Sequence, residues 1–231
     1  MEAALPDVDD ERPSRAGMRR TQFVIAATKL MEQHGFHGMT TDQLAREAGV
    51  SVGLVYKYFA KKEDILLAVI LHVLDAYAVE VPRAIELGKN TIEKLFFGFA
   101  AYCLVVDEQR RAAILAYRES KTLTAEGLTQ IKSMERSTTQ LFETLIRRGI
   151  DEGIFLETNA MLVAYDIVVL GHMWALKYWH FRDSMVVEDY ILGQMRLILG
   201  SLLSRGDRDM YLSEISLKSI EKYRTFRRAE G

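Results

Sequence analysis

MTTDQLAREAGVSVGLVYKYFAKKEDIL, residues 39 to 66, carries the signals of two short helices joined by a turn. Thr40 followed three residues later by Gln43 is a capping-box pattern, in which each side chain accepts a hydrogen bond from the backbone N–H of the other residue. We therefore expect the first helix to begin directly after Thr40. Gly49 marks its end, because glycine adopts the left-handed conformation that terminates helices at little steric cost.

The second helix is expected from Val52 to Phe59, with the Ser51 hydroxyl as its cap. Val55 and Phe59 lie four residues apart, about one helical turn, so both should point into a core. The outward face then mixes apolar, aromatic and basic residues: Val52, Gly53, Leu54, Tyr56, Lys57 and Tyr58. Two helices joined by a glycine-bearing turn, the second with such a face, have the geometry that enters the major groove of DNA.

The pattern GFHGMTTDQLAxxAGVSVGLVYKYFxxKEDIL, residues 35 to 66, resembles the N-terminal domain of the TetR family of bacterial one-component regulators. The resemblance extends from about Arg19 to Leu67, under a third of the chain, and has many fixed positions without a gap. It implies an all-helical homodimer, in which each subunit has a three-helix DNA-binding head and a helical body with a small-molecule pocket. The resemblance does not identify the small molecule.

The exposed side chains of the head have expected roles on double-stranded DNA. Phosphate contacts, which set the register without reading sequence, are expected from Arg19, Arg20, Thr40, Ser51, Tyr58 and Lys62. Base edges are expected to meet Val52, Gly53, Leu54, Tyr56 and Lys57. Leu54 stands where the family often has a hydroxyl residue, which argues against a polar base contact there. The alternative for Tyr58 and Lys62 is that they only cover a helical surface.

Charge is unevenly distributed along the 231 residues, whose formal net charge is −2. Residues 1 to 11 carry −5 and residues 12 to 62 carry +6, which leaves −3 for the rest. A local excess of positive charge is the electrostatic footprint of phosphate binding. The single cysteine, Cys103, excludes an internal disulfide and is expected to be a buried structural thiol.

Few prolines and apolar residues at three-to-four spacing predict an all-α fold. Besides the two helices above, we expect helices over residues 17–34, 61–81, 91–106, 108–120, 125–152, 159–181, 188–204 and 211–226. The first of them is expected to bury Phe23, Ile25, Ala26, Leu30 and Met31. The helix over 61–81 has an apolar face wide enough to connect head and body.

Four segments follow from this pattern. They are a flexible arm over residues 1–16, a helix-turn-helix domain over 17–62, a ligand-binding and dimerisation domain over 63–205, and a C-terminal extension over 206–231. Arg12 and Arg15 in the arm either contact DNA or are solvated. The extension either braces the dimer or lies near the DNA-facing side.

Two late helices are expected to form a four-helix dimer interface, because small residues in their apolar stripes allow helices to approach closely. The stripes are Ala164, Ile167, Val168, Gly171 and Ala175 in the first helix, and Ile191, Met195, Ile198, Leu199 and Leu202 in the second.

Aromatic residues with polar neighbours predict an effector site in the body, although such a set is more often plain core. Trp174, Lys177 and Tyr178 lie at positions i, i+3 and i+4 of one expected helix, which would place a cation beside two aromatic walls. The expected set is Phe99, Tyr102, Tyr117, Arg118, Phe142, Trp174, Lys177 and Tyr178, with Lys121 as a further cation. Apolar volume with a cation at its rim suits a lipophilic anion. The runs RESKTL, from Arg118, and WALKYWHFR, from Trp174, also resemble TetR members that sense acyl-CoA thioesters.

The favoured function is a DNA-binding transcriptional regulator, a repressor released from a palindromic operator by a small lipophilic acid or acyl-CoA. An activator, a response to an aromatic or cationic drug-like compound, and a helical enzyme or lipid carrier stay open as alternatives. We expect no catalytic residue, metal or cofactor, because the five histidines lack a ligand spacing and no phosphate loop occurs. Without a signal peptide or an uninterrupted apolar span, the protein is expected in the cytoplasm and not in a membrane.

Overall fold

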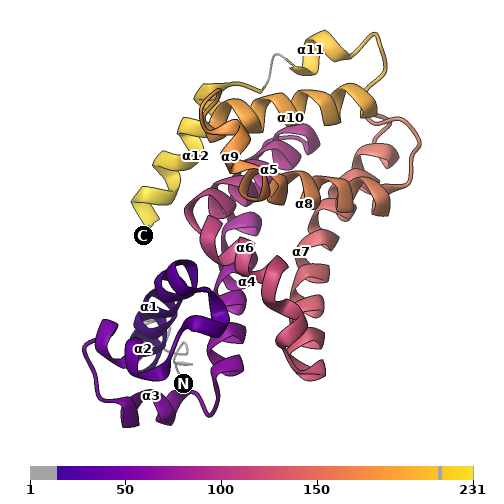
Figure 1. Cartoon of the computed structure of the whole chain (residues 1–231). Coiled ribbons are helices and arrows are strands. Elements are labelled where there is room, and N and C mark those ends of the chain that lie inside the picture. The colour runs from indigo at the N-terminus through magenta and orange to yellow at the C-terminus, as the bar shows by residue number, and fades with distance from the viewer. Residues whose placement is uncertain (1–14, 213–214, 231) are drawn as a thin grey trace, which may run out of the picture. The chain divides into compact units, whose positions relative to one another are not determined.

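Figure 1 shows the computed structural model of the chain, which describes residues 15–212 and 215–230. These residues form twelve α-helices, one short 3-10 helix and no strand, which confirms the predicted all-α fold. The chain divides into two compact units, one ending at Ile65 and the other beginning at Leu66. The arm expected over residues 1–16, including Arg12, lies outside the described residues apart from its last two positions.

The first unit contains α1 (Arg15–Gly38), α2 (Thr41–Glu47) and α3 (Val52–Tyr58). α1 continues beyond the expected end through a kink at Gly35, where φ is +69°. Four of the five residues predicted for its core face are buried, but Ile25 is 63% exposed, so its predicted burial is wrong. Ile25 lies two residues, or about 200°, from both Phe23 and Ala27, which define the buried side of the helix.

The turn between α2 and α3 has the predicted local geometry. The Thr40 hydroxyl accepts from the Gln43 N–H at 3.2 Å, and the Gln43 side chain accepts from the Thr40 N–H at 2.8 Å. Gly49 has a φ of +64°, and the Ser51 hydroxyl accepts from the Leu54 N–H at 3.3 Å. These bonds satisfy backbone donors at the start of each helix and thereby set where the two helices begin.

A long helix, α4 (Lys62–Glu86), begins in the first unit and continues into the second. The sequence predicts its end at about Val81, and Pro82, which follows, cannot donate a backbone hydrogen bond. The helix instead continues for five residues, and Ala84 and Ile85 beyond the proline are buried. Burial of this last turn compensates for the missing bond. By length and composition alone α4 could cross a membrane, but half of its most apolar window is buried, as in a core helix.

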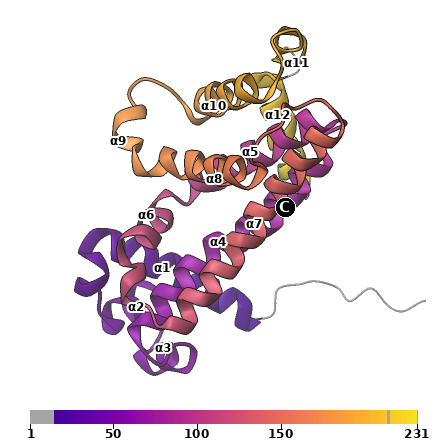
Figure 2. The same cartoon turned by 90° about the vertical axis from the view of Figure 1, so that its right-hand side faces the viewer.

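The second unit is built around α5 (Thr91–Glu108), whose residues 95–106 are all buried. A helix that is apolar on all sides must be surrounded, and α5 packs against α7 (Ala125–Asp151), α8 (Ala160–Leu176), α10 (Val187–Leu202) and α12 (Leu217–Glu230). Figure 2 shows this arrangement from the side. The remaining elements are α6 (Arg110–Glu119), a 3-10 helix (Ser120–Thr122), α9 (Tyr178–Phe181) and α11 (Arg208–Leu212).

The prediction of a single helix over residues 159–181 is wrong. α8 ends at Leu176, and Lys177 leaves helical geometry with φ −115° and ψ 18° before α9 begins. The break lets Trp174 stack on Phe181, with ring centroids 5.9 Å apart and planes 9° apart. In a straight helix these two residues would be about 10 Å apart along the axis, so stacking requires the break.

The stripes predicted for the dimer interface are buried inside the second unit, so their assignment to a dimer is wrong. Gly171 illustrates the reason, because a Cβ at this position would lie 2.5 Å from the Tyr102 ring. The small residues of α8 therefore allow close packing on α5 within the chain.

The C-terminal extension is part of the second unit. In α12, Ile220 and Tyr223 are fully buried, and the Tyr223 hydroxyl donates to Glu80 of α4 at 2.8 Å. Arg227 forms ion pairs with Glu80 at 3.0 Å and with Glu108 of α5 at 2.6 Å. α12 therefore binds the ends of α4 and α5 together within one subunit.

Candidate functional sites: the recognition helix and the body cavity

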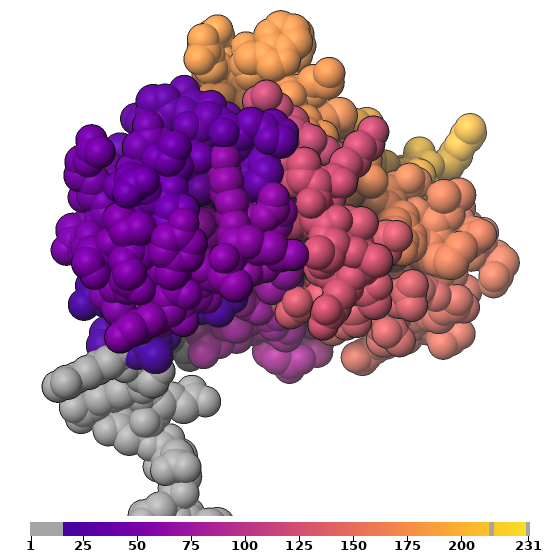
Figure 3. Space-filling view, turned by 60° about the horizontal axis from the view of Figure 1, so that its bottom comes forward, coloured from indigo at the N-terminus to yellow at the C-terminus, as the bar shows by residue number. Residues whose placement is uncertain are grey.

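The exposed face of α3 lies at the surface of the first unit, on the side that Figure 3 brings forward. Val55 and Phe59 are buried, as predicted. Gly53, Tyr56 and Lys57 are exposed, and Val52, Leu54 and Tyr58 are partly exposed. This short helix therefore offers a face of aromatic, aliphatic and basic groups, which suits a groove of DNA.

Contacts from α1 hold this face in place. Phe23 packs edge-on against Tyr58 and Phe59, with ring centroids 5.3 and 5.9 Å apart. The Gln22 amide donates to the Ala48 carbonyl at 2.8 Å, and Lys29 pairs with Glu47 at 2.5 Å, so α1 also secures the end of α2. The recognition helix is therefore set by packing on α1 and by its own cap.

The predicted phosphate-contacting cations differ in their surroundings. Lys62 donates to the His37 carbonyl at 2.9 Å and lies 4.8 Å from the centre of the Phe36 ring, and desolvation lowers the pKa of its ammonium group. Arg19 donates to Gln22 at 2.7 Å, and Arg20 lies over the Phe59 ring at 5.4 Å. Lys62 thus joins the start of α4 to the last turn of α1, a structural contact that no local sequence pattern indicates.

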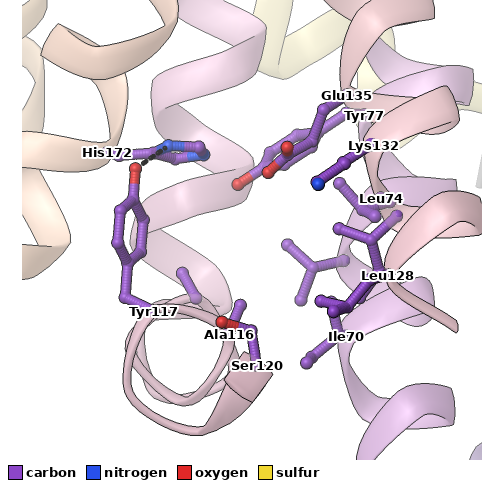
Figure 4. Close-up of a pocket in the computed structure, with 13 residues that line it drawn as sticks. Ile70, Leu74, Tyr77, Ala116, Tyr117, Ser120, Leu128, Lys132, Glu135 and His172 are labelled. Atoms are coloured by element: carbon purple, nitrogen blue, oxygen red, sulfur yellow. Dashed lines mark hydrogen bonds between the residues drawn. The ribbon is translucent and has the colours of Figure 1, made fainter. Parts of the chain in front are cut away.

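The second unit contains a cavity of about 320 Å³ between α4, α6, α7 and α8. Figure 4 shows its walls, where apolar side chains surround a few polar groups. The lining residues are Ile70, Val73, Leu74, Tyr77, Ala113, Ala116, Tyr117, Ser120, Leu128, Ile131, Lys132, Glu135 and His172. A concave, mostly apolar site with a few polar groups is typical of a small-molecule pocket.

A chain of hydrogen bonds crosses the inner wall of this cavity. The Tyr117 hydroxyl lies 2.8 Å from Nδ1 of His172, and the Tyr102 hydroxyl lies 2.6 Å from Nε2 of the same ring. Burial lowers the pKa of His172 to about 4, so the imidazole is neutral at physiological pH. Burial also raises the pKa of Tyr102 and Tyr117, so both phenols stay protonated.

The opposite wall comes from α7, where Lys132 and Glu135 reach the cavity from its solvent-exposed side. They are three residues apart and follow Leu128 and Ile131 on the same face of the helix. Desolvation raises the pKa of the Glu135 carboxyl, and the Lys132 charge opposes this shift. The cation that lines the cavity is therefore Lys132, which is not among the cations predicted from the sequence.

Of the eight effector residues predicted from sequence, Tyr117 is the one that lines this cavity. Tyr102 lies behind it, bonded to His172, and Phe142 packs edge-on against Tyr102 with centroids 6.1 Å apart. Phe99 is fully buried within α5. Arg118 and Lys177 are exposed, as is Lys121, and these three cations are not among the lining residues.

Trp174 and Tyr178 belong to a separate aromatic cluster and do not flank Lys177 on one helical face as predicted. The Trp174 indole donates to Asp107 at 2.7 Å, and its ring contacts Phe181 and Tyr190. Arg110 lies 3.9 Å over the Tyr178 ring. The break after Leu176 separates Lys177 from both rings, so this cluster is a packed corner of the fold.

Two further expectations concern other chemistry. Cys103 is fully buried, and desolvation raises the pKa of its thiol, in agreement with a structural thiol. Among residues 15–212 and 215–230, no group of three His, Cys, Asp or Glu side chains is placed to hold a metal ion.

Comparison with known proteins identifies the family. The family described as "Bacterial regulatory proteins, tetR family" matches residues 24–69, and "Tetracyclin repressor-like, C-terminal domain" matches residues 88–183. The HTH-type transcriptional regulator HbdR of Aromatoleum sp. (strain CIB) is 41% identical over 192 residues, which cover 83% of this chain and 84% of that protein.

Solved structures show the same fold. A bacterial regulatory protein in the tetR family from Rhodococcus RHA1 has a TM-score of 0.73 at 22% identity, covering 80% of this chain and 96% of that one. The regulator FadR from Bacillus subtilis, in complex with stearoyl-CoA, has a TM-score of 0.68 at 19% identity, covering 78% and 98%. The chain therefore belongs to the TetR family and is a DNA-binding transcriptional regulator.

Proposed function

We propose that the protein is a cytoplasmic repressor that binds a roughly palindromic operator as a homodimer and leaves it when an acyl-CoA thioester enters the body cavity. The observation that carries the ligand response is the cavity itself, because α4 supplies four of its lining residues, Ile70, Val73, Leu74 and Tyr77. The same helix begins at Lys62, directly after the helix-turn-helix. A ligand in the cavity therefore acts on the helix that leads to the DNA reader.

On DNA, α3 is proposed to enter the major groove. Lys57 reaches guanine acceptors, and Leu54 or Tyr56 packs on a thymine methyl group. Phosphate contacts come from Arg19, Arg20, Thr40, Ser51, Tyr58 and Lys62, and base contacts also involve Val52 and Gly53. One recognition helix covers too few base pairs to be selective alone, so half-sites should repeat after about 10 base pairs or a small multiple.

Replacing Lys57 with alanine is expected to relax the preference at one base pair of each half-site by about five- to a hundredfold, equivalent to about 1–3 kcal/mol. Tyr58→Phe and Lys62→Ala are expected to weaken binding to all sequences alike, and Lys62→Ala should also flatten the salt slope by about one unit. Fluorescence anisotropy against operator variants at several salt concentrations measures both effects. If Lys62→Ala changed base preference and left the salt slope intact, Lys62 would contact a base and not a phosphate, and its assigned role would be wrong. Lys89→Ala, in the second unit, serves as the control.

The proposed dimer interface is formed by the exposed sides of α8 and α10, which pack against the same helices of a second copy of the chain. Apolar side chains are exposed on both helices: Met161, Leu162, Tyr165 and Val169 on α8, and Leu197 on α10, with Val186 directly before α10. Gly193 and Gly200 flank Leu197 at helical spacing and have no atom within 4 Å of an added Cβ, so another helix can approach closely. This face replaces the buried stripes as the proposed interface and keeps the proposed four-helix arrangement.

The cavity suggests how an acyl-CoA would bind. Its volume lies near the lower end of the range for small-molecule pockets, so it suits a compact acyl group. Lys132 on the exposed side can then attract the phosphates of the CoA. The B. subtilis structure with stearoyl-CoA supports this ligand class by analogy within the fold.

Release from DNA requires the ligand to bind the DNA-incompetent arrangement more tightly than the competent one. A preference of about 3 kcal/mol shifts the equilibrium by more than a hundredfold. A small tilt of α4 is the proposed change, because it would alter the separation of the two recognition helices in the dimer.

Lys132→Ala is expected to raise the acyl-CoA concentration needed for operator release by about tenfold, equivalent to about 1.4 kcal/mol for one charge-assisted hydrogen bond. Arg118→Ala and Lys177→Ala, outside the lining, should leave that concentration nearly unchanged. A mobility-shift titration with acyl-CoAs of varied chain length checks all three variants, and DNA affinity without ligand is the reference. If an aromatic or cationic compound released the DNA and no acyl-CoA did, the proposed effector class would be wrong. The assignment as a DNA-binding regulator would still stand.

A further inference from the structure

The Tyr77 hydroxyl is a buried polar group in the wall of the cavity. The side chain is 2% exposed, lines the cavity and stacks on Tyr102 with ring centroids 4.2 Å apart. Its hydroxyl is buried and makes no hydrogen bond of good geometry with any part of the chain that the structure describes. In Figure 4 this oxygen points into the space between the His172 wall and the α7 wall.

The Tyr102 hydroxyl is the neighbouring polar group. Its hydrogen bond with Tyr77 is outside good geometry but lowers the pKa of Tyr77, while its bond of 2.6 Å goes to His172. Desolvation outweighs this effect and raises the pKa of Tyr77, so the phenol remains a donor. A buried donor without a partner is costly, and such a group in a pocket often marks the place of a ligand atom.

The hydrogen-bond chain on the inner wall adds a second donor. A neutral His172 has one N–H for two tyrosine neighbours. If the fully buried Tyr102 hydroxyl donates to Nε2, the ring proton of His172 is on Nδ1. This N–H then donates to the Tyr117 oxygen. The Tyr117 proton is then free to donate into the cavity that this side chain lines. In that tautomer two phenolic donors, Tyr77 and Tyr117, face the same space.

We infer that the cavity selects an acyl group that carries an oxygen, as in a hydroxyacyl- or oxoacyl-CoA, over the plain hydrocarbon acyl group of the same size. This inference rests on the proposed acyl-CoA response and specifies the chemical class of the acyl part. The oxygen of the ligand accepts from Tyr77, and a saturated chain in the same place would leave that buried donor unpaired. A site built to hydrogen-bond an oxygen discriminates strongly against an analogue without it.

The test compares hexanoyl-CoA with hydroxyhexanoyl-CoAs that carry one hydroxyl at successive carbons, and with 3-oxohexanoyl-CoA. Binding to the full-length dimer is measured by titration calorimetry for the natural protein, Tyr77→Phe and Tyr190→Phe. Tyr190 donates to the Leu170 carbonyl at 2.5 Å and does not line the cavity, so Tyr190→Phe is the matched control. We expect the best oxygen-bearing thioester to bind the natural protein at least about tenfold more tightly than hexanoyl-CoA.

In Tyr77→Phe this preference should fall below about threefold, whereas Tyr190→Phe should retain it. Without ligand, Tyr77→Phe should melt about 2 °C or more above the natural protein, because an unpaired buried hydroxyl is removed, and Tyr190→Phe should melt lower. Equal binding of hexanoyl-CoA and every oxygen-bearing thioester, or a preference that survives in Tyr77→Phe, would overturn the inference and leave the proposed function intact. A lower melting temperature for Tyr77→Phe would show that the hydroxyl has a partner and would also overturn the inference. If no thioester bound the natural protein, the proposed function would fail first, and this inference with it.

Discussion

Leu197→Glu is expected to convert the proposed dimer into a monomer and to weaken operator binding at least a hundredfold. Leu197 is 70% exposed on α10, between two glycines whose Cβ positions are open. If a second copy covers this face, two-fold symmetry brings both new carboxylates into one apolar contact. Burying each without a partner costs several kcal/mol, and a monomer presents one recognition helix to one half-site.

Light scattering and anisotropy with an operator duplex measure this pair of effects at the same protein concentration. Leu217→Glu is the matched control, because Leu217 is 48% exposed and is the first residue of α12, where an acidic side chain suits the helix dipole. The control should remain a dimer with nearly unchanged affinity. A Leu197→Glu protein that stayed dimeric and bound the operator normally would place the interface elsewhere.

Acidification from pH 7.5 to 4.5 is expected to destabilise the natural protein by about 2–3 kcal/mol more than a His172→Gln variant. Burial lowers the pKa of His172 to about 4, whereas an unfolded histidine titrates near its usual value of 6.5. Between these values the unfolded state binds a proton that the folded state does not. Stability from this residue is therefore fully present above about pH 6.5 and is lost as the pH falls towards 4, with no further loss below.

Urea unfolding at the two pH values and at one fixed protein concentration measures the difference, since unfolding of a dimer depends on concentration. His180→Gln is the control, because His180 is exposed. This variant should lose as much free energy of unfolding on acidification as the natural protein does. If the natural protein and His172→Gln lost equal free energy of unfolding on acidification, His172 would be protonated in the folded protein at pH 4.5. The Tyr102–His172–Tyr117 chain would then need a different arrangement of protons.

The DNA-binding head follows from the sequence because the interactions that form it are local. The capping box joins residues three apart, the turn needs the positive φ of Gly49, and one helical turn separates Val55 from Phe59. Each of these features is decided within a few residues and independently of the rest of the fold. Contacts between distant residues then fix how the helices pack, such as the bonds from Lys62 to the His37 carbonyl, 25 residues apart, and from Gln22 to the Ala48 carbonyl, 26 residues apart.

The cavity and the outer face of the body depend on tertiary structure. Tyr77, Tyr117, Lys132 and His172 come from four helices and span 95 residues, so no local pattern brings them together. The sequence showed which residues could be core and which could carry charge. Only packing on α5 decided that the small-residue stripe of α8 faces inward and that Leu197 faces outward.

The aromatic run that begins at Trp174 shows most clearly what local sequence determines and what tertiary packing determines. Periodicity placed Trp174, Lys177 and Tyr178 on one helical face, since no glycine or proline interrupts the run. The helix ends at Leu176 because Trp174 is held by Asp107, 67 residues away, and stacks on Phe181 beyond the break. Local propensity thus determined that this segment is helical, while the distant partners of one buried indole decided where the helix stops.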